Sequence, residues 1–106
     1  MEKNSVLERI RQSIHTSDPS AEAYLFGSRA RGDNRPDSDW DLLILVDDEK
    51  VTNEVLDKFY DPLYDIELEI GDIITPIIYP KKLWYGNKLF KYSPLHKNVI
   101  KEGIRL

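Results

Sequence analysis

The run WDLLILV, at residues 40–46, constrains the fold of this chain more than any other stretch. Its last five residues are all apolar, so Asp41 is the only polar side chain that a strand formed here carries. Strand side chains alternate between the two faces of a sheet, and a strand that is apolar on both faces is buried on both. The run therefore predicts the central strand of an α/β sheet that is covered on both sides.

Helical and strand patterns alternate on either side of this run. They predict helices at residues 5–15, 51–70 and 93–103, short helical turns at 28–32 and 81–84, and further strands at 22–26 and 72–79. Ser5 is the expected N-cap of the first helix, and Pro62 is expected to kink or divide the second. Pro76 cannot donate a ladder hydrogen bond, so the last strand is placed at a sheet edge. The order of elements predicts a small α/β domain with a mixed sheet of at least three strands, flanked by helices.

The composition limits the class of protein. A chain of 106 residues suits one domain, residues 1–106, and leaves little room for a second. The absence of Cys excludes disulfides and thiolate metal sites and fits a cytoplasmic location. The N-terminus lacks the apolar core of a signal peptide, and no run reaches membrane-spanning length, so no membrane association is expected. A net charge of −4 disfavours a surface that coats nucleic acid.

Two acidic residues open the apolar strand. Because side chains alternate, Asp39 and Asp41 lie on one face, and Trp40 and Leu42 lie on the other, where Trp40 is expected to be a core residue. Two carboxylates held this close repel each other unless a positive charge lies between them. A hard divalent cation such as Mg²⁺ fits, because it takes oxygen ligands and keeps positions open for water or substrate phosphates. Ser38 is expected to bond to nearby backbone and fix the start of the strand.

A candidate phosphate site precedes the acidic pair. Gly27 allows the backbone to pass close to a ligand, and Ser28 begins a short helix whose first N–H groups can bind an anion. Arg31 is a candidate for phosphate binding or for a structural role within the motif. Arg29 and Arg35 are expected to be solvated. A phosphate site followed by a metal-binding carboxylate pair on a rigid strand is a layout for phosphoryl transfer.

The segments GSRARG, DNRPD and SDWDLLIL, all within residues 26–46, resemble the motif of the DNA polymerase β-like nucleotidyltransferase superfamily. That motif consists of Gly-Ser, a spacer of about a dozen residues and an acid-x-acid pair that opens a hydrophobic strand. The closest resemblance is to the minimal nucleotidyltransferases, small bacterial and archaeal proteins that are often paired with a HEPN-domain protein. Outside residues 26–46, only the order of the elements agrees.

This resemblance implies a polymerase β-like nucleotidyltransferase fold and an enzyme that uses Mg²⁺ and a nucleoside triphosphate. Gly27 and Ser28 would hold the triphosphate, and Arg31 and Ser38 belong to the same nucleotide site. Asp39 and Asp41 would be the catalytic pair and would bind two Mg²⁺ ions. An acceptor hydroxyl would attack the α-phosphorus, with ATP the expected donor, and pyrophosphate would leave. The implied acceptor is a HEPN-type partner protein in a toxin–antitoxin module, and nucleic acid enters only as a possible acceptor.

The sequence departs from the family pattern at one point. Active members usually carry a third carboxylate in the middle of the next strand, and here that position is Thr75. Asp72 and Glu69 are the candidates to replace it, although neither lies where the pattern requires. Two alternatives to the transferase therefore stay open: a catalytically impaired module that binds nucleotide or a partner, and a small-molecule transferase of the antibiotic-modifying type. The short chain disfavours the latter.

Overall fold

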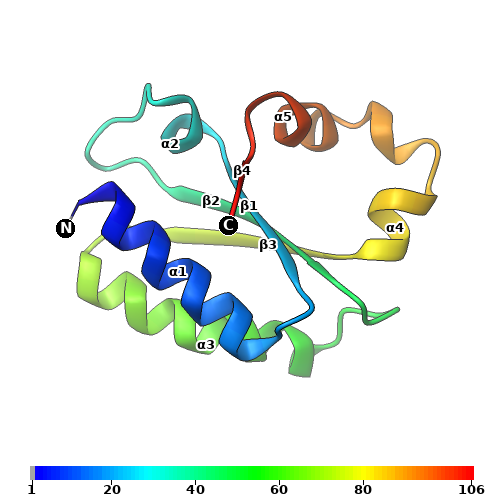
Figure 1. Ribbon diagram of the computed structural model, residues 1–106, viewed down its shortest axis with the longest axis horizontal. Coiled ribbons are helices and arrows are strands. Elements are labelled where there is room, and N and C mark those ends of the chain that lie inside the picture. Colours follow the sequence, from blue (N-terminus) through cyan, green and yellow to red (C-terminus); the bar gives the residue numbers. More distant parts are fainter. Residues whose placement is uncertain (1) are drawn as a thin grey trace.

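A computed structural model describes residues 2–106, and its centre is a four-stranded mixed sheet with the strand order β3-β2-β1-β4 (Figure 1). The strands are β1 (Glu22–Phe26), β2 (Trp40–Val46), β3 (Ile74–Pro80) and β4 (Ile104–Arg105). β2 pairs in parallel with β3, whereas β1 is antiparallel to both β2 and β4. The central position that the apolar run predicts for β2 is thus confirmed.

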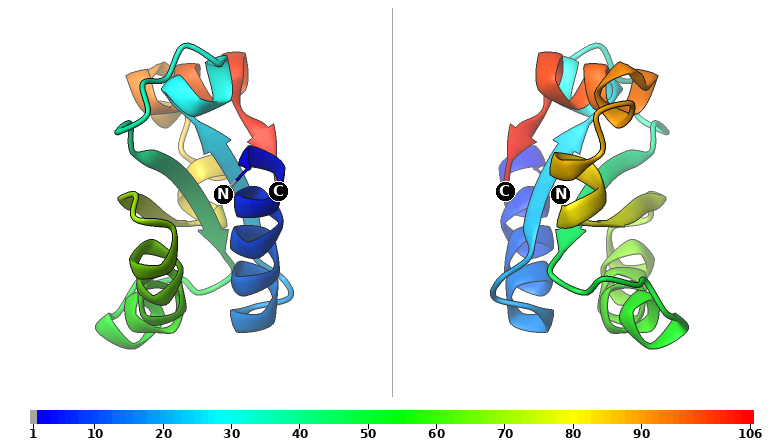
Figure 2. Two further views of the ribbon diagram at one scale, coloured as in Figure 1. Left: turned by 90° about the vertical axis from the view of Figure 1, so that its left-hand side faces the viewer. Right: turned by 90° about the vertical axis from the view of Figure 1, so that its right-hand side faces the viewer.

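Helices cover both faces of the sheet (Figure 2). The first face is covered by α1 (Lys3–Ser17) and α3 (Asn53–Ile70). The second face carries α4 (Lys81–Gly86), the 3₁₀ turn η1 (Phe90–Tyr92) and α5 (Pro94–Glu102). The short helix α2 (Ser28–Arg31) follows β1, and its Ala30 packs against the cluster of the first face. Within residues 2–106, none of these helices combines the length and the apolar character that crossing a membrane requires.

The side chains of β2 divide between two core clusters. Trp40, Leu42, Ile44 and Val46 pack with α1 and α3, while Leu43 and Leu45 pack with Trp84 of α4 and Val99 of α5. All of these side chains are buried. Because the alternation is regular, Asp41 lies on the α4/α5 face with Leu43 and Leu45. The prediction that the acidic pair and the side chains of Trp40 and Leu42 lie on opposite faces is therefore confirmed for Asp41.

The edge position predicted for β3 is also confirmed. The Trp40 N–H donates to the Ile73 carbonyl at 2.9 Å, so in this parallel register the backbone groups of Ile74, Pro76, Ile78 and Pro80 face the open edge. Two of these four residues are prolines without an N–H, and the Ile74 N–H donates to Glu67 Oε1 at 2.8 Å. The edge is thereby protected against pairing with another strand.

Some local predictions are wrong. α1 begins at Lys3 and Glu2 is its N-cap, so Ser5 lies inside the helix and does not cap it. α3 begins after Thr52, whose hydroxyl caps the Val55 N–H, and it continues through Pro62 as one helix. Of the two effects expected of Pro62, the division is wrong, because α3 is continuous from Asn53 to Ile70. Phe59 before the proline and Leu63 and Ile66 after it all belong to the same core cluster. β4 was not predicted, since a two-residue strand has no recognisable pattern.

Candidate functional site

The first part of the site is the turn between β1 and α2. Gly27 has φ 80° and ψ −162°, a conformation that favours glycine, and its carbonyl accepts the N–H groups of Ala30 and Arg31, both at 3.1 Å. The predicted helical turn then ends at Gly32, which has φ 86°. Since helical bonding starts at Ala30, the N–H groups of Ser28 and Arg29 lie ahead of the helical pattern. Such a turn is suited to an anionic group.

The carboxylate pair lies beside this turn. Asp41 pairs with Phe26, the last residue of β1, and a Cβ placed on Gly27 would overlap the Asp41 carboxylate, coming within 3.2 Å of its Cγ. Asp39 is exposed, and its Oδ2 accepts a long hydrogen bond of 3.4 Å from the Thr75 hydroxyl. The Gly27 turn, Asp41, Asp39 and Thr75 therefore form one continuous surface.

Asp41 is in an unfavourable environment for a negative charge. Partial burial raises the pKa of the Asp41 carboxyl, and the neighbouring charge of Asp39 raises it further, with a smaller contribution from Glu102. The positive charge of Arg31 acts in the opposite direction. The surroundings thus leave the pair short of positive charge, which is the situation that a bound cation relieves.

Arg29 is buried, so the prediction that it is solvated is wrong. Its Nε donates to the Ser38 carbonyl at 2.9 Å and its Nη2 to the Pro36 carbonyl at 3.1 Å. Its guanidinium stacks on the Trp40 ring, 4.2 Å from the centroid. These contacts hold the loop before β2 against α2 and so fix the position at which the carboxylate pair begins. Arg29 is buried because the Ser38 and Pro36 carbonyls need hydrogen-bond donors, and one guanidinium group can donate to both at the same time.

Replacing this arginine tests its role. We expect Arg29→Lys to lower the free energy of unfolding by about 1–3 kcal/mol, because an ammonium group cannot donate to both carbonyls while it stacks on Trp40. Urea denaturation measures the effect. Arg35→Lys is the matched control, since Arg35 lies exposed in the same loop and its replacement is expected to change stability by less than about 0.5 kcal/mol. Equal stabilities of the two variants would contradict the assignment.

The other predicted residues of the nucleotide site are engaged within the chain. The Ser38 hydroxyl accepts the Arg35 N–H at 2.8 Å, which is the local bond that the sequence predicts. Arg31 donates to Asp33 at 3.1 Å and to Glu102 Oε2 at 2.8 Å. Glu102 ends α5 with a side chain only 11% exposed, and no local sequence pattern predicts this long-range contact. The nucleotide-binding roles of these residues stay predictions.

The position of the missing third acid is clear in the structure. Thr75 is paired with Asp41 in the β2–β3 register, so it stands where the family pattern places a carboxylate. Asp72 does not replace it, because Asp72 Oδ2 lies 3.3 Å from the Trp40 indole nitrogen and 3.5 Å from Arg29. Glu69 does not either, since it forms a 2.7 Å ion pair with Arg9 of α1. Across residues 2–106, no three or more Asp, Glu, His or Cys side chains come together as a metal-holding group.

Comparison with known proteins identifies the family. The nucleotidyltransferase domain matches residues 7–106, nearly the whole chain. The chain belongs to the nucleotidyltransferase domain family. A relative from Methanocaldococcus jannaschii, named "Putative protein adenylyltransferase", is 37% identical over 79 residues, which cover 74% of this chain and 70% of the relative. The general activity of this family member is therefore that of a nucleotidyltransferase.

Solved structures agree with this nucleotidyltransferase fold. One described as "putative minimal nucleotidyltransferase" has a TM-score of 0.63 and 25% identity, over 100% of this chain and 97% of the other. A toxin–antitoxin crystal structure with AMP-PNP has a TM-score of 0.64 and 17% identity, over 92% of this chain and 69% of its own. A toxin–antitoxin structure of MntA–HpeT has a TM-score of 0.58 and 19% identity, over 100% and 72%. Because the two toxin–antitoxin structures are less than 25% identical to this chain, their similarity shows the fold alone.

Proposed function

We propose that this nucleotidyltransferase transfers AMP from ATP to a hydroxyl group of a partner protein in a Mg²⁺-dependent reaction. The observation that carries the proposal is the direct contact between the Gly27 turn and Asp41 on one face of the sheet. A turn suited to an anionic group and the carboxylate pair lie together there, although they come from different elements. In a nucleotidyl transfer, the acceptor hydroxyl loses its proton to solvent and its oxygen forms a bond to the α-phosphorus. The bond from the α-phosphorus to the bridging oxygen of the β-phosphate breaks, and pyrophosphate leaves with the electron pair.

The chain supplies binding and orientation. The Ser28 N–H and hydroxyl, at the start of α2, bind the phosphates, and Arg31 adds positive charge at the same end of the sheet. Its two carboxylate partners, Asp33 and Glu102, set the direction of the guanidinium. Arg29 and Ser38 act indirectly, because they fix the loop from which Asp39 and Asp41 project.

The carboxylate pair fits Mg²⁺. The donors are oxygen atoms only, the pKa of Asp41 is raised by burial and by Asp39, and Mg²⁺ is usually held by one or two carboxylates together with substrate phosphates. Asp39 and Asp41 would hold the ion. When bound, it would neutralise charge on the phosphates and lower the pKa of the acceptor hydroxyl.

A protein acceptor is favoured by the relatives. The name of the Methanocaldococcus jannaschii protein specifies protein adenylylation, and two of the similar folds are toxin–antitoxin assemblies, one of them with the ATP analogue AMP-PNP. The sequence resemblance adds a HEPN-domain protein as the partner. In that reading the chain is an antitoxin that blocks its partner by attaching AMP.

Intact-mass measurement tests the function. The protein is incubated with ATP, Mg²⁺ and the product of the neighbouring gene, and the partner is expected to gain the mass of one or more adenylyl groups. An ATP analogue with a methylene group between the α- and β-phosphorus is the control, because it keeps the phosphate contacts but cannot release pyrophosphate. If the partner binds but its mass stays unchanged with ATP, the transferase proposal is wrong.

Thr75 favours a second candidate, a module that binds nucleotide and a partner without catalysis. A hydroxyl at the third acidic position can neither complete a carboxylate triad nor act as an efficient base at neutral pH.

Thr75→Asp tests whether the missing third carboxylate limits transfer. It places a carboxylate opposite Asp41, and we expect AMP transfer to become at least about tenfold faster, since general base catalysis contributes about 10²–10⁴-fold. Transfer is measured by intact mass in a time course. Thr75→Asn is the control of similar size without the charge. If Thr75→Asp is no faster than Thr75→Asn, the third position does not limit catalysis.

A further inference from the structure

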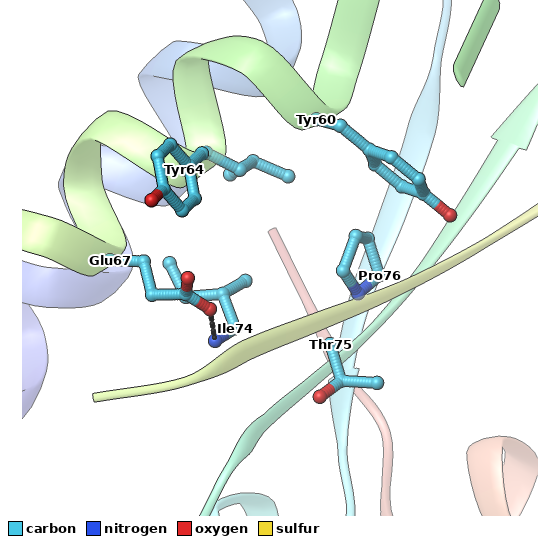
Figure 3. A pocket seen from close by; sticks show the side chains of 7 residues that line it. Tyr60, Tyr64, Glu67, Ile74, Thr75 and Pro76 are labelled. Carbon is cyan, nitrogen blue, oxygen red and sulfur yellow. Dashed lines mark hydrogen bonds between the residues drawn. The ribbon is translucent and has the colours of Figure 1, made fainter. Parts of the chain in front are cut away.

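A groove lies between α3 and the edge strand β3, and Thr75 lies at its rim with its side chain pointing away from it (Figure 3). Its volume is about 380 Å³, enough for one or two large side chains. Tyr60 and Tyr64 form one wall and Ile74 and Pro76 the other. Tyr64 is 57% exposed, and the neighbouring Leu68 and Ile73 are 66% and 59% exposed. The groove is thus an apolar surface without a partner in this chain.

The segment that includes α3, one wall of the groove, is strongly acidic. Residues 53–72 hold seven acidic side chains and one lysine, a net charge of −6 in a chain whose total is −4. Asp57, Asp61 and Asp65 follow one another at i,i+4 spacing, which destabilises a helix because like charges become neighbours. All three are exposed, and none forms an ion pair within residues 2–106. This charge disfavours a nucleotide or nucleic acid and favours a basic occupant.

A surface with the opposite properties lies on the other side of the same molecule. Residues 81–101, which form α4, η1 and most of α5, hold six lysines and no acidic side chain. Large apolar side chains are exposed among these lysines: Leu89 is 78%, Tyr92 is 63% and Ile100 is 70% exposed. This basic surface covers one face of the sheet, whereas α3 covers the other (Figure 1). One molecule therefore cannot bring its two surfaces together.

We propose that the α3/β3 groove binds the basic surface, residues 81–101, of a second copy of this chain. Asp57 and Asp61 of α3 are exposed and form no ion pair within residues 2–106, and the same holds for Lys88 and Lys91 of the basic surface. These unpaired charges of opposite sign, each beside exposed apolar side chains, make the two surfaces complementary. The contact is made by side chains, because Pro76, Pro80 and the Glu67 bond to the Ile74 N–H prevent strand addition at the β3 edge.

Such a contact is heterologous. Each molecule uses its groove toward one neighbour and its basic surface toward another, so the association continues to a ring or an open chain. Sedimentation velocity at rising protein concentration is expected to show species larger than a dimer. The affinity is expected to fall at least about tenfold between about 0.1 M and about 1 M salt, because the Debye length shortens from about 10 Å to about 3 Å.

Charge reversal on each surface gives the decisive experiment. Asp57→Lys/Asp61→Lys removes the acidic groove, and Lys88→Glu/Lys91→Glu removes the basic surface. Each variant alone is expected to be monomeric. A mixture of the two keeps one intact groove and one intact basic surface, so it is expected to form a one-to-one dimer that does not grow further. Tyr60→Ala/Tyr64→Ala tests the apolar part of the contact and is expected to weaken association at least about tenfold.

The control is Glu2→Lys/Asp48→Lys, which changes the net charge as much as the groove variant but at exposed residues elsewhere. It is expected to associate like the unchanged protein. The proposal is overturned if the unchanged protein is monomeric at low salt and high concentration. It is equally overturned if either charge-reversal variant still associates normally, or if the mixture of the two stays monomeric. Circular dichroism establishes that each variant is folded before sedimentation is interpreted.

Discussion

Asp41→Asn is expected to abolish AMP transfer and, in the same protein without Mg²⁺, to raise the melting temperature. If Asp41 holds Mg²⁺ as proposed, its loss removes several kcal/mol of transition-state stabilisation, which corresponds to a decrease of at least about 100-fold in rate. The stability effect has the opposite sign because the carboxylate is strained by its surroundings: burial and the charge of Asp39 raise the pKa of Asp41. A residue kept for function at a cost in stability is typical of active sites.

The pH dependence of this stability effect follows from the direction of the shift. A carboxyl whose pKa is higher in the folded than in the unfolded protein binds its proton more tightly when folded, so stability falls as the pH rises through the folded pKa. Asparagine stays neutral and avoids this loss. The gain in melting temperature is therefore expected at neutral pH. It should vanish at a pH below the unfolded pKa of Asp, where the Asp41 carboxyl is protonated in both the folded and the unfolded protein.

Differential scanning fluorimetry with and without Mg²⁺ measures the stability, and intact mass measures the transfer. Asp48→Asn is the control, because Asp48 is exposed in the turn after β2 and has no part in the site. A melting temperature below that of the unchanged protein would show that Asp41 stabilises the metal-free fold. Transfer at more than about a tenth of the normal rate would exclude Asp41 from catalysis.

The sequence predicts the parts of this molecule that local patterns determine. The alternation in WDLLILV predicts both the central position of β2 and the separation of Asp41 from Trp40, because a strand has only two faces. Pro76 predicts the sheet edge, because a proline lacks the N–H that an inner strand needs. The glycines at 27 and 32 predict a helical turn between them. In each case the cause lies within a few residues of its effect.

The residues that the sequence does not predict depend on contacts between distant segments. Arg29 is buried because three groups from later in the chain surround it, and Glu102 approaches Arg31 across 71 residues. A search for sequence patterns finds two arginines near a phosphate motif. It cannot tell which of them has a structural role and which has an electrostatic role. Asp72 illustrates the same limit, since its pairing with Trp40 becomes visible only when β3 is placed beside β2.

Gly27→Ala is expected to cost both stability and nearly all transfer activity, for two separable reasons. The residue has φ 80°, which strains any side chain by about 1–3 kcal/mol, and the added methyl group would overlap the Asp41 carboxylate. Either the turn or the carboxylate must move, and a displacement of about 1 Å at a reacting centre can lower the rate about 100-fold. Urea denaturation and the intact-mass assay measure the two effects.

Gly71→Ala isolates the backbone part of the effect. Gly71 has φ 76°, close to that of Gly27, but nothing lies within 4 Å of an added Cβ. We expect Gly71→Ala to lose stability and keep transfer, so the excess loss in Gly27→Ala is the overlap with Asp41. The double variant Gly27→Ala/Asp41→Gly removes the overlapping carboxylate and is expected to be more stable than Gly27→Ala alone. If Gly27→Ala transfers AMP as fast as Gly71→Ala, the close approach of turn and carboxylate has no role in catalysis.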